Sequence, residues 1–355
     1  MTLQSPLHDR HRIAGAKFAE FAGWSMPLEY SGTVAEHTGV REAVGVFDVS
    51  HLGTLVARGP VPVLNTVLSN DLQRIGTGQA QYTLLLNDVG GVVDDLIVYK
   101  VADDEFLLVP NAANCARVAA TLTEAGLAVE NVHEATAIIA VQGPGSDAIL
   151  PFGDLDYMAF RATQFAGVQC TVCRTGYTGE RGVEILVAAQ DAGAVWDALV
   201  AAGAVPCGLG ARDTLRTEMG YALHGHELAP DVPARWSSVS WAVVPGKGDF
   251  LGRQAYVDTE PDQKIVGLLV TGRGIPRAGM EVLRGDERVG TTTSGTFSPT
   301  LAQGIALARV VRDVSPGDEV QIAVRGRNVP ARVVVLTLGA RSRGPPGSRC
   351  ASQRR

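Results

Sequence analysis

The chain of 355 residues is long enough for more than one folded domain, and a composition of 46% hydrophobic and 19% charged residues is typical of a globular protein. Its net charge of −6 argues against broad nucleic-acid binding, because neutralising phosphates requires a concentrated basic surface. No run approaches the roughly 20 apolar residues of a membrane-spanning helix, and the N-terminus has no apolar signal-peptide stretch. We therefore predict a cytoplasmic protein that binds neither nucleic acid nor membranes.

Cysteine and histidine spacing gives little support for a metal site. Five cysteines, an odd number, indicate a reducing compartment and no disulfide framework. Cys170 and Cys173 form a lone CxxC in an expected strand, where residues three apart face opposite sides. His224, His226 and Glu227 could ligate a metal, but histidines two apart do not share a helical face, which favours packing in a loop. We expect no metal.

Hydrophobic patterning divides the chain into segments of different character. Over residues 1–140, short β-like runs such as QYTLLLN and EFLLVPN alternate with helical stretches such as NCARVAATLTEAG, which predicts an α+β domain. The alternation resumes over 141–258 and predicts a second α+β domain. Residues 259–337 contain short strands at regular intervals with Gly and Asp turns, typical of an all-β barrel. The last residues, 338–355, have nothing to bury and predict a disordered tail.

The stretch VQGPGSDAI resembles part of a dinucleotide-binding fingerprint, because Gly143 and Gly145 follow a strand and precede a helix. The third glycine of that fingerprint is missing, and no well-placed acid follows a second strand. We interpret this stretch as a plain strand-to-helix turn.

The stretch NDVGGVVDDLIVYK, residues 87–100, places two adjacent acids inside a run typical of a buried strand. Because side chains alternate along a strand, Asp94 and Asp95 cannot both point the same way. Burying an unpaired carboxylate is unfavourable unless the group is hydrogen-bonded or functional. We expect one acid to face a cavity and the other to be tied to backbone or solvent. The residues alone leave open whether either is catalytic.

Two further stretches place polar side chains beside glycine turns. RTGYTGERGVEI carries Tyr177 and Glu184 from a Gly-rich loop into a strand, and GLGARDTLRTEMG puts Arg212 near the start of a helix. Taken singly, Glu184 could be a solvated strand residue, and Arg212 could pair with Asp213 or Glu218.

Seven motifs in chain order together resemble one known family. They are FAGWSMPLEY, GVFDVSHLG, LLNDVGGVVDDLIVY, PNAAN, RTGYTGERGVEI, GLGARDTLRTEMGYALHGHEL and TSGTFSPTL. In this order they closely resemble the T-protein of the glycine cleavage system, the aminomethyltransferase, from about residue 5 to about residue 336.

The resemblance implies an α+β fold of three domains, arranged as a cloverleaf around a central folate site, with two α+β domains and a C-terminal all-β barrel. It implies a reaction in which the aminomethyl group on the lipoyl arm of the H-protein gives its one-carbon unit to tetrahydrofolate. The products are 5,10-methylenetetrahydrofolate, ammonia and the dihydrolipoyl arm. The partners are then lipoylated H-protein and tetrahydrofolate, the latter as co-substrate.

The resemblance also implies roles for particular residues. Asp94 matches the family's reacting carboxylate, which accepts a proton or stabilises a developing cation. Asp95 is then the structural member of the pair. Glu184 matches the glutamate that recognises the pterin, since a carboxylate suits the adjacent N–H donors of that ring. The remaining expected folate contacts are Arg212, Tyr177, Asn111, Trp241 and Tyr82.

Alternatives on the same fold remain open. A folate-binding protein of iron-sulfur assembly would carry a Lys-Gly-Cys-Tyr-like motif, but KGDFLGRQ has Asp249 where the cysteine would be. A folate-dependent demethylase would take a methyl group from another donor, and the related dehydrogenases need a flavin domain for which 355 residues leave no room. A catalytically dead H-protein-binding module is disfavoured because Asp94, Glu184 and Arg212 are all present.

The C-terminal end departs from the family pattern. Relatives usually close the barrel with an apolar segment containing Pro and Phe, followed by a short tail that can approach the folate. Here the sequence is VVVLTLGARSRGPPGSRCASQRR. We hypothesise that this end has diverged or arises from an altered reading frame, which leaves open any folate contact supplied by it.

Overall fold

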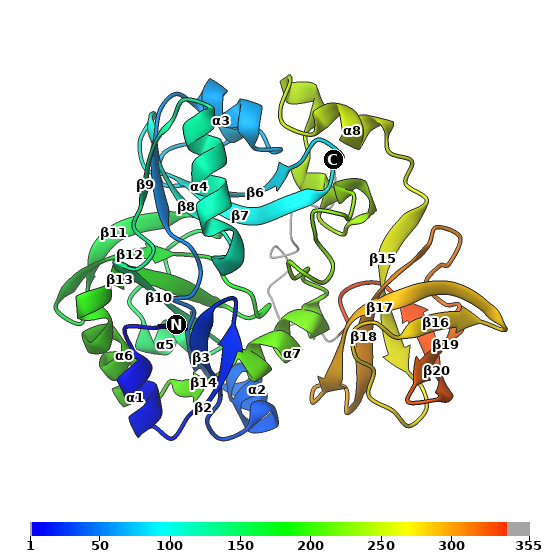
Figure 1. Cartoon of the computed structure of the whole chain (residues 1–355). Coiled ribbons are helices and arrows are strands. Elements are labelled where there is room, and N and C mark those ends of the chain that lie inside the picture. The colour runs from blue at the N-terminus through cyan, green and yellow to red at the C-terminus, as the bar shows by residue number, and fades with distance from the viewer. Residues whose placement is uncertain (1, 339–355) are drawn as a thin grey trace. The chain divides into compact units, whose positions relative to one another are not determined.

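The computed structural model describes residues 2–338 (Figure 1). It divides into two compact units. The first contains residues up to Leu85, Asp94–Asp213 and Lys247–Leu251, and the second contains Leu86–Val93, Thr214–Gly246 and the residues from Gly252 onward. The predicted disordered tail, 338–355, lies outside the described residues except for Leu338.

A small sheet opens the first unit. Its order is β1-β3-β2, with β1 parallel to β3 and β2 antiparallel to it. The strands are β1 (Leu3–Gln4), β2 (Lys17–Phe21) and β3 (Trp24–Glu29), with α1 (His8–Ile13) between β1 and β2 and α2 (Thr33–Glu42) after β3.

A six-stranded sheet follows in the order β11-β12-β13-β10-β4-β14. Neighbouring strands are antiparallel except β14, which runs parallel to β4. Helix α6 packs against β10 and β4, and α2 packs against β4 and β14. The elements are β4 (Gly45–Asp48), β10 (Thr136–Gln142), α5 (Ser146–Ile149), β11 (Phe160–Phe165), β12 (Val168–Cys173), β13 (Gly182–Ala188), α6 (Ala192–Ala201) and β14 (Val205–Cys207).

A five-stranded sheet in the order β6-β7-β8-β5-β9 carries the acid pair. Helix α4 packs against β5, β9 and α3. The elements are β5 (Leu55–Arg58), α3 (Val61–Val67), β6 (Ala80–Leu86), β7 (Val92–Lys100), β8 (Glu105–Val109), α4 (Cys115–Glu124) and β9 (Ala128–Asn131). The turn between β6 and β7 belongs to the second unit.

Strand alternation sets the core of the six-stranded sheet. Val183, Ile185 and Val187 of β13 point into one apolar cluster together with Ile139 of β10. Glu184 therefore points to the opposite face of the same strand. Burial of each such aliphatic side chain contributes about 1.5–3 kcal/mol, so the alternation fixes the register of β13 and with it the direction of Glu184.

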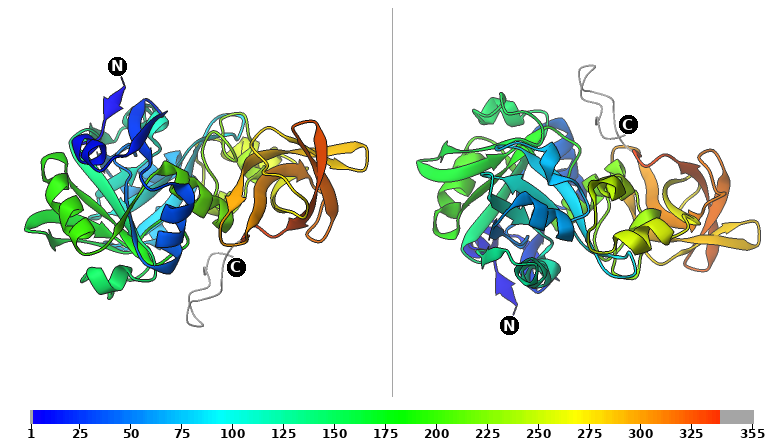
Figure 2. Two further views of the ribbon diagram at one scale, coloured as in Figure 1. Left: turned by 90° about the horizontal axis from the view of Figure 1, so that it is seen from below. Right: turned by 90° about the horizontal axis from the view of Figure 1, so that it is seen from above.

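The second unit contains a closed barrel in the order β15-β18-β17-β16-β19-β20, coloured from yellow to red in Figures 1 and 2. Its interior is filled by aliphatic side chains such as Leu268, Ile322 and Val333, none of them exposed. The elements are α8 (Arg253–Asp258), β15 (Gln263–Val270), β16 (Glu281–Arg284), β17 (Glu287–Ser298), β18 (Gln303–Val311), β19 (Glu319–Val324) and β20 (Arg327–Val334). Helix α7 (Leu209–Met219) begins in the first unit and ends in the second.

These elements confirm the predicted α+β class with a C-terminal all-β barrel. The three domain boundaries stay predictions. Every helix in residues 2–338 is too short or too polar to cross a membrane.

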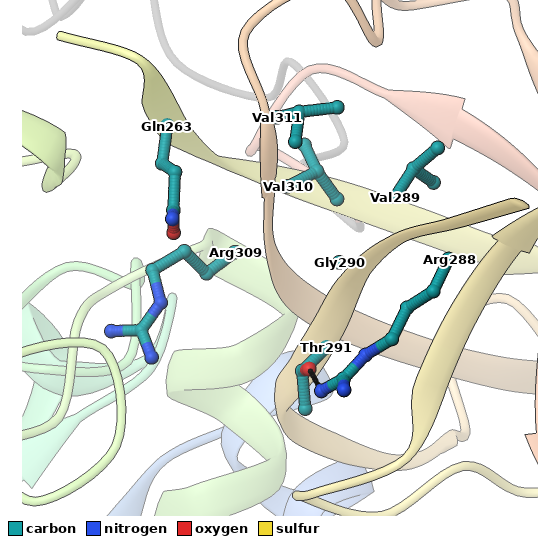
Figure 3. Close-up of a pocket in the computed structure, with 8 residues that line it drawn as sticks. All are labelled: Gln263, Arg288, Val289, Gly290, Thr291, Arg309, Val310 and Val311. Carbon is teal, nitrogen blue, oxygen red and sulfur yellow. Dashed lines mark hydrogen bonds between the residues drawn. The ribbon is translucent and has the colours of Figure 1, made fainter.

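A cleft of about 300 Å³ lies on the barrel, over β17, β18 and the start of β15 (Figure 3). Arg288, Arg309 and Gln263 are among its lining residues. None of the site residues expected from the sequence lines this cleft.

Packing within the protein explains why the VQGPG turn has glycine at position 143, with no need for a bound nucleotide. The φ of Gly143 is +143°, and a Cβ there would lie 2.4 Å from the carbonyl oxygen of Ala43. The turn therefore packs backbone against backbone, which agrees with the structural interpretation of this stretch.

We expect Gly143→Ala to lower the free energy of unfolding by roughly 2 kcal/mol or more, because backbone strain and a clash with a main-chain carbonyl add. Urea unfolding of the first unit would measure it. Gly76→Ala, in the same unit, is the matched control, since a Cβ at Gly76 would meet only the Gln79 side chain, at an ordinary contact distance of 3.6 Å. Equal stability of the two variants would contradict the packing described for this turn.

Candidate active site

Strand β7 holds the two acids on opposite faces. Asp94 shares its face with Leu96 and Val98, and all three are almost completely buried, Asp94 at 0% exposure. Asp95 shares the other face with Ile97 and is partly exposed. The strand therefore gives the two carboxylates different access to any ligand.

The Asp94 carboxylate is enclosed by amides from the PNAAN stretch. Its Oδ1 accepts hydrogen bonds from Asn111 Nδ2 at 2.9 Å and from Asn114 Nδ2 at 2.8 Å. Its Oδ2 accepts a longer bond, 3.3 Å, from the Asn111 backbone N–H. Both oxygens thus have protein donors, so Asp94 is held in place by residues 111–114.

Burial raises the pKa of Asp94 well above its ordinary value, and the nearby charge of Asp95 raises it further. The amides of Asn114 and Asn111 act in the opposite direction, because they stabilise the ionised form. Burial dominates, so Asp94 keeps its proton to a higher pH than an exposed aspartate.

Asp95 binds different partners. The Tyr82 hydroxyl donates to Asp95 Oδ2 at 2.9 Å, and Asn111 Nδ2 lies 2.8 Å from Asp95 Oδ1. Asn111 Nδ2 also lies 2.9 Å from the Asp95 carbonyl oxygen, so its two hydrogens are shared among three oxygens, one of them on Asp94. Burial and the Asp95 charge raise the pKa of Tyr82, which keeps it a hydrogen-bond donor.

Glu184 is buried and takes part in a chain of hydroxyl groups. Thr175 Oγ1 donates to Glu184 Oε2 at 2.5 Å, and the Tyr99 hydroxyl lies 3.2 Å from Thr175 Oγ1. Because the single Thr175 proton is directed to Glu184, Tyr99 donates to Thr175. Tyr99 lies on the same face of β7 as Asp95, so this chain connects the Glu184 face of the six-stranded sheet with the Asp95 face of β7.

Arg212 lies over the ring of Tyr177, with 4.6 Å between the guanidinium carbon and the ring centroid. This is a cation–π arrangement that orients both planar groups. His51 is nearly fully buried, and its pKa is lowered to about 3 by burial and then by the positive charge of Arg212. His51 is therefore neutral at physiological pH.

The site residues expected from the sequence differ in whether they contact one another and in which unit they belong to. Asp94, Asp95, Asn111 and Tyr82 form one hydrogen-bonded cluster within the first unit. Glu184, Tyr177 and Arg212 belong to the same unit. Trp241 belongs to the second unit, where its side chain is 46% exposed.

Two contacts were missed by sequence reasoning. Asn114 holds Asp94, and Thr175 holds Glu184. The second asparagine of PNAAN was a visible signal for the first contact. Thr175 precedes a glycine in a loop, and nothing in its spacing points to a carboxylate nine residues later.

Other candidate ligands are occupied by structural contacts. Within residues 2–338, no group of three or more His, Cys, Asp or Glu side chains could hold a metal ion. Glu227 forms a fully buried ion pair with Arg216 at 3.0 Å and accepts a hydrogen bond from Ser294. Cys170 and Cys173 are buried free thiols on different faces of β12.

Comparison with known proteins identifies similar chains over nearly the whole length. The sequence matches the family described as "GCVT N-terminal domain" over residues 7–247 and the "Glycine cleavage T-protein C-terminal barrel domain" over 263–338. It is 53% identical to an aminomethyltransferase of Mycolicibacterium paratuberculosis over 350 residues, which covers 94% of this chain and 95% of that protein. An aminomethyltransferase of Frankia alni is 50% identical, with 93% and 96% covered.

A solved structure is similar over the same range. It is the glycine cleavage system aminomethyltransferase T from Bartonella henselae, with 33% sequence identity and a TM-score of 0.89. The match covers 95% of this chain and 98% of that one.

The raised pKa of Asp94 makes a prediction about stability. A carboxyl whose folded pKa exceeds its unfolded value of about 3.8 stabilises the fold fully below that value, and the contribution is lost as pH rises toward the folded pKa. Asp94→Asn removes this titration. We expect the stability of Asp94→Asn relative to wild type to increase from pH 4.5 to pH 7.5, by at most about 1.4 kcal/mol per pH unit.

Urea unfolding at both pH values measures this difference. The exposed Asp104→Asn serves as the control and should show no such trend. A relative stability of Asp94→Asn that stays flat or falls with pH would mean that Asp94 is ionised at little cost in the fold.

Proposed function

Because this chain belongs to the glycine cleavage T-protein family of aminomethyltransferases, we propose that it transfers the one-carbon unit of an aminomethyl group on the dihydrolipoyl arm of the H-protein to tetrahydrofolate. The products are 5,10-methylenetetrahydrofolate, ammonia and the dihydrolipoyl H-protein. The observation that carries this proposal is the match, over more than nine-tenths of the chain, to relatives named aminomethyltransferase.

The chemistry requires a group that accepts a proton from the attacking folate nitrogen or stabilises positive charge on the methylene carbon. Asp95 suits this role better than Asp94, because it is partly exposed while Asp94 is completely enclosed. The Tyr82 hydroxyl orients the Asp95 carboxylate through its 2.9 Å hydrogen bond. This proposal exchanges the roles that the sequence suggested for the two acids.

Asp94 has a supporting role in this proposal. Its carboxyl fixes the amides of Asn111 and Asn114, and Asn111 in turn contacts Asp95. Because the pKa of Asp94 is raised, Asp94 can hold a proton while the negative charge of the pair lies on Asp95.

Glu184 is the proposed partner of the pterin N–H donors. Thr175 donates to one carboxylate oxygen, Oε2, which fixes the side chain and leaves Oε1 for a ligand donor. Arg212 and Tyr177, stacked at 4.6 Å, offer guanidinium donors and an aromatic face to the folate. Asn111 and Tyr82 complete the folate contacts proposed within the first unit, and a contact by Trp241 stays a prediction from the sequence.

The proposed partners are lipoylated H-protein and tetrahydrofolate, and the reaction needs no metal. The folate-binding iron-sulfur assembly protein and the folate-dependent demethylase, considered from the sequence, gain no support from the relatives found. The cytoplasmic location stays a prediction.

The activity is tested by supplying the purified protein with tetrahydrofolate and aminomethylated H-protein. We expect ammonia and 5,10-methylenetetrahydrofolate to form in equal amounts. Omission of H-protein or of folate should reduce ammonia release to background. A protein that binds tetrahydrofolate yet releases no ammonia would contradict the transferase function for this chain.

Glu184→Gln tests pterin recognition separately. An amide keeps the shape but cannot accept from two adjacent N–H groups with full charge, so we expect the Kd for tetrahydrofolate to rise roughly 10- to 100-fold, equivalent to about 1.4–2.7 kcal/mol. Fluorescence titration measures the Kd. Glu180→Gln, in the preceding loop, is the control, and an unchanged Kd for Glu184→Gln would exclude this carboxylate from the pterin site.

A further inference from the structure

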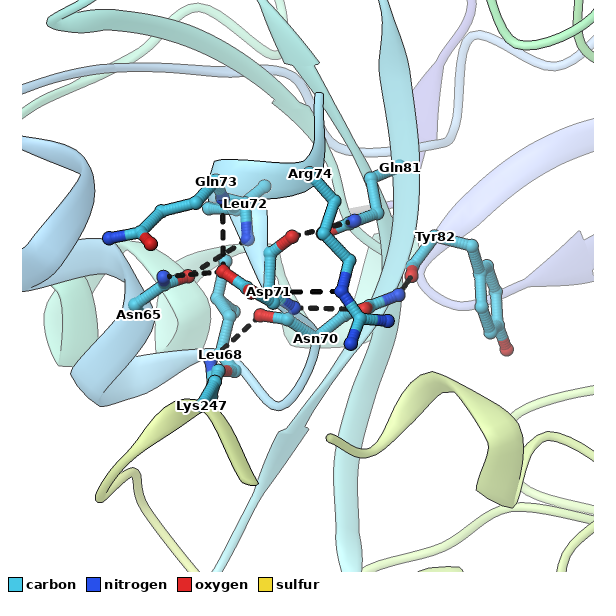
Figure 4. A network of polar contacts seen from close by, with 10 residues as sticks. All are labelled: Asn65, Leu68, Asn70, Asp71, Leu72, Gln73, Arg74, Gln81, Tyr82 and Lys247. Carbon is cyan, nitrogen blue, oxygen red and sulfur yellow. Dashed lines mark hydrogen bonds and ion pairs between the residues drawn. The ribbon is translucent and has the colours of Figure 1, made fainter. Parts of the chain in front are cut away.

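The short segment Lys247–Leu251 is the part of the chain after Asp213 that belongs to the first unit. Lys247 Nζ donates to the carbonyl oxygen of Asn70 at 2.7 Å and to that of Leu68 (Figure 4). It also lies 5.0 Å from the centre of the Phe250 ring. The Leu251 N–H donates to the Thr66 carbonyl at 3.0 Å. The segment is thus attached to residues 66–70 at several points.

Residues 68–70 continue the five-stranded sheet beyond its edge strand β6. The Ser69 N–H donates to the Leu84 carbonyl at 2.9 Å, and the Asn70 N–H donates to Thr83 Oγ1 at 3.0 Å. On its outer side, this stretch presents carbonyl oxygens that need donors. The Lys247 ammonium supplies donors to two of them.

The Asn70 side chain connects residues 68–70 to the candidate site. Its Nδ2 donates to the Tyr82 carbonyl oxygen at 2.8 Å, and Tyr82 donates to Asp95. In Figure 4, Asn70 lies between Lys247 on one side and Tyr82 on the other. A displacement of residues 68–70 therefore reaches the residue that orients Asp95.

We propose that Lys247 is a positioning residue for the transfer reaction: it holds residues 68–70 against β6 through the Leu68 and Asn70 carbonyls and so fixes Tyr82 and, through it, Asp95. This inference deepens the proposed function and rests on it. Lys247 acts through other residues and does not itself touch the reacting atoms.

The charge of Lys247 strengthens these contacts, because charge-assisted hydrogen bonds are about twice as strong as neutral ones. Burial lowers the pKa of Lys247 to about 8, partly opposed by the charge of Asp71. Asp71 itself lies 3.6 Å from Arg74 and accepts from Asn65 and from the Gln73 backbone. Asp249, next but one along the chain, accepts from the Phe250 backbone N–H.

Turnover and stability should change in opposite directions with pH, which distinguishes a role of Lys247 in positioning from a role in folding. Lys247 is charged below about pH 8 and neutral above it. Turnover that depends on the charged form falls as pH rises through about 8. Stability moves the other way, because a lysine with a lowered folded pKa contributes stability that is present above the unfolded value of about 10.5 and is lost as pH falls toward 8. A loss of activity caused by loss of fold would follow the second direction.

The test uses the full chain with aminomethylated H-protein and tetrahydrofolate, between pH 6.5 and 9.5. In wild type, we expect kcat to fall on the alkaline side with a midpoint near pH 8. Lys247→Arg keeps its charge throughout this range, so its alkaline fall should move upward or disappear. Lys247→Met should lower kcat roughly tenfold at pH 7.5, since a small misplacement of reacting groups costs one to two orders of magnitude.

Two further variants control for folding. Lys17→Met removes an exposed lysine that pairs with Glu29 in the same unit, and it should retain wild-type turnover. Asn70→Ala keeps the backbone carbonyl that Lys247 contacts but removes the amide that reaches Tyr82. It should reproduce the loss in kcat of Lys247→Met while leaving the KM for H-protein unchanged.

The inference is overturned if Lys247→Arg retains the same alkaline midpoint as wild type, or if folded Lys247→Met has wild-type kcat. The wild-type rate at pH 7.5 tests the proposed function separately from the role of Lys247. Should wild type fail to turn over, the Kd for tetrahydrofolate still decides: we expect it to be at least threefold weaker in Lys247→Met and Asn70→Ala than in Lys17→Met, and equal values overturn the inference.

Discussion

The central constraint of the first unit is the sharing of one asparagine side chain between two adjacent carboxylates. Successive residues of β7 point to opposite faces, yet Asn111 Nδ2 lies within 2.9 Å of oxygen atoms from both Asp94 and Asp95. The amide reduces the unfavourable burial of Asp94 and at the same time orients its neighbour. The site therefore depends on where residues 111–114 are held.

Several local features hold those residues. The Gly53 N–H donates to the Pro110 carbonyl at 2.9 Å, and a Cβ at Gly53 would lie 2.7 Å from Cys115 Sγ. Only glycine allows this close approach. Asn114 occupies the N-cap position of α4 but makes no capping hydrogen bond with its side chain, because that amide is directed to Asp94.

A capping side chain typically stabilises a helix by about 1 kcal/mol. Helix α4 forgoes this contribution, and its stability then rests on the burial of residues such as Val118 and Leu122. The usual preference for a side-chain cap at a helix N-terminus is thus not met at Asn114, whose amide donates to the Asp94 carboxyl group instead. Such exceptions are expected where a fold supports chemistry.

The sequence predicted the architecture because hydrophobic periodicity carries it. The β13 pattern that places Val183 and Ile185 in the core also determines the face of Glu184. The closed barrel follows from short strands separated by Gly and Asp turns. These features depend on local spacing, which a single sequence contains.

The details of the site depended on contacts between distant segments. Alternation showed that Asp94 and Asp95 face opposite ways, but it could not determine which acid would be fully buried and which would contact Tyr82. That choice follows from the position of residues 111–114, whose amides reach Asp94, and from Tyr82, whose hydroxyl reaches Asp95. The contacts of Thr175 with Glu184 and of Lys247 with Asn70 could not be predicted for the same reason, since the partners lie in other segments of the chain.

From the different environments of the two acids, we infer that Asp95 acts in the transfer reaction and that Asp94 supports it. The most direct test is single-turnover ammonia release by Asp94→Asn and Asp95→Asn with saturating tetrahydrofolate and aminomethylated H-protein, with folate affinity measured in parallel. An asparagine at 95 can still accept from Asn111 and can meet the Tyr82 hydroxyl with its amide, so geometry is kept while the charge is lost. We expect Asp95→Asn to bind folate but to lose at least about a hundredfold in rate, and Asp94→Asn to keep most of its rate. A fully active Asp95→Asn beside an inactive, folded Asp94→Asn would instead assign the chemistry to Asp94.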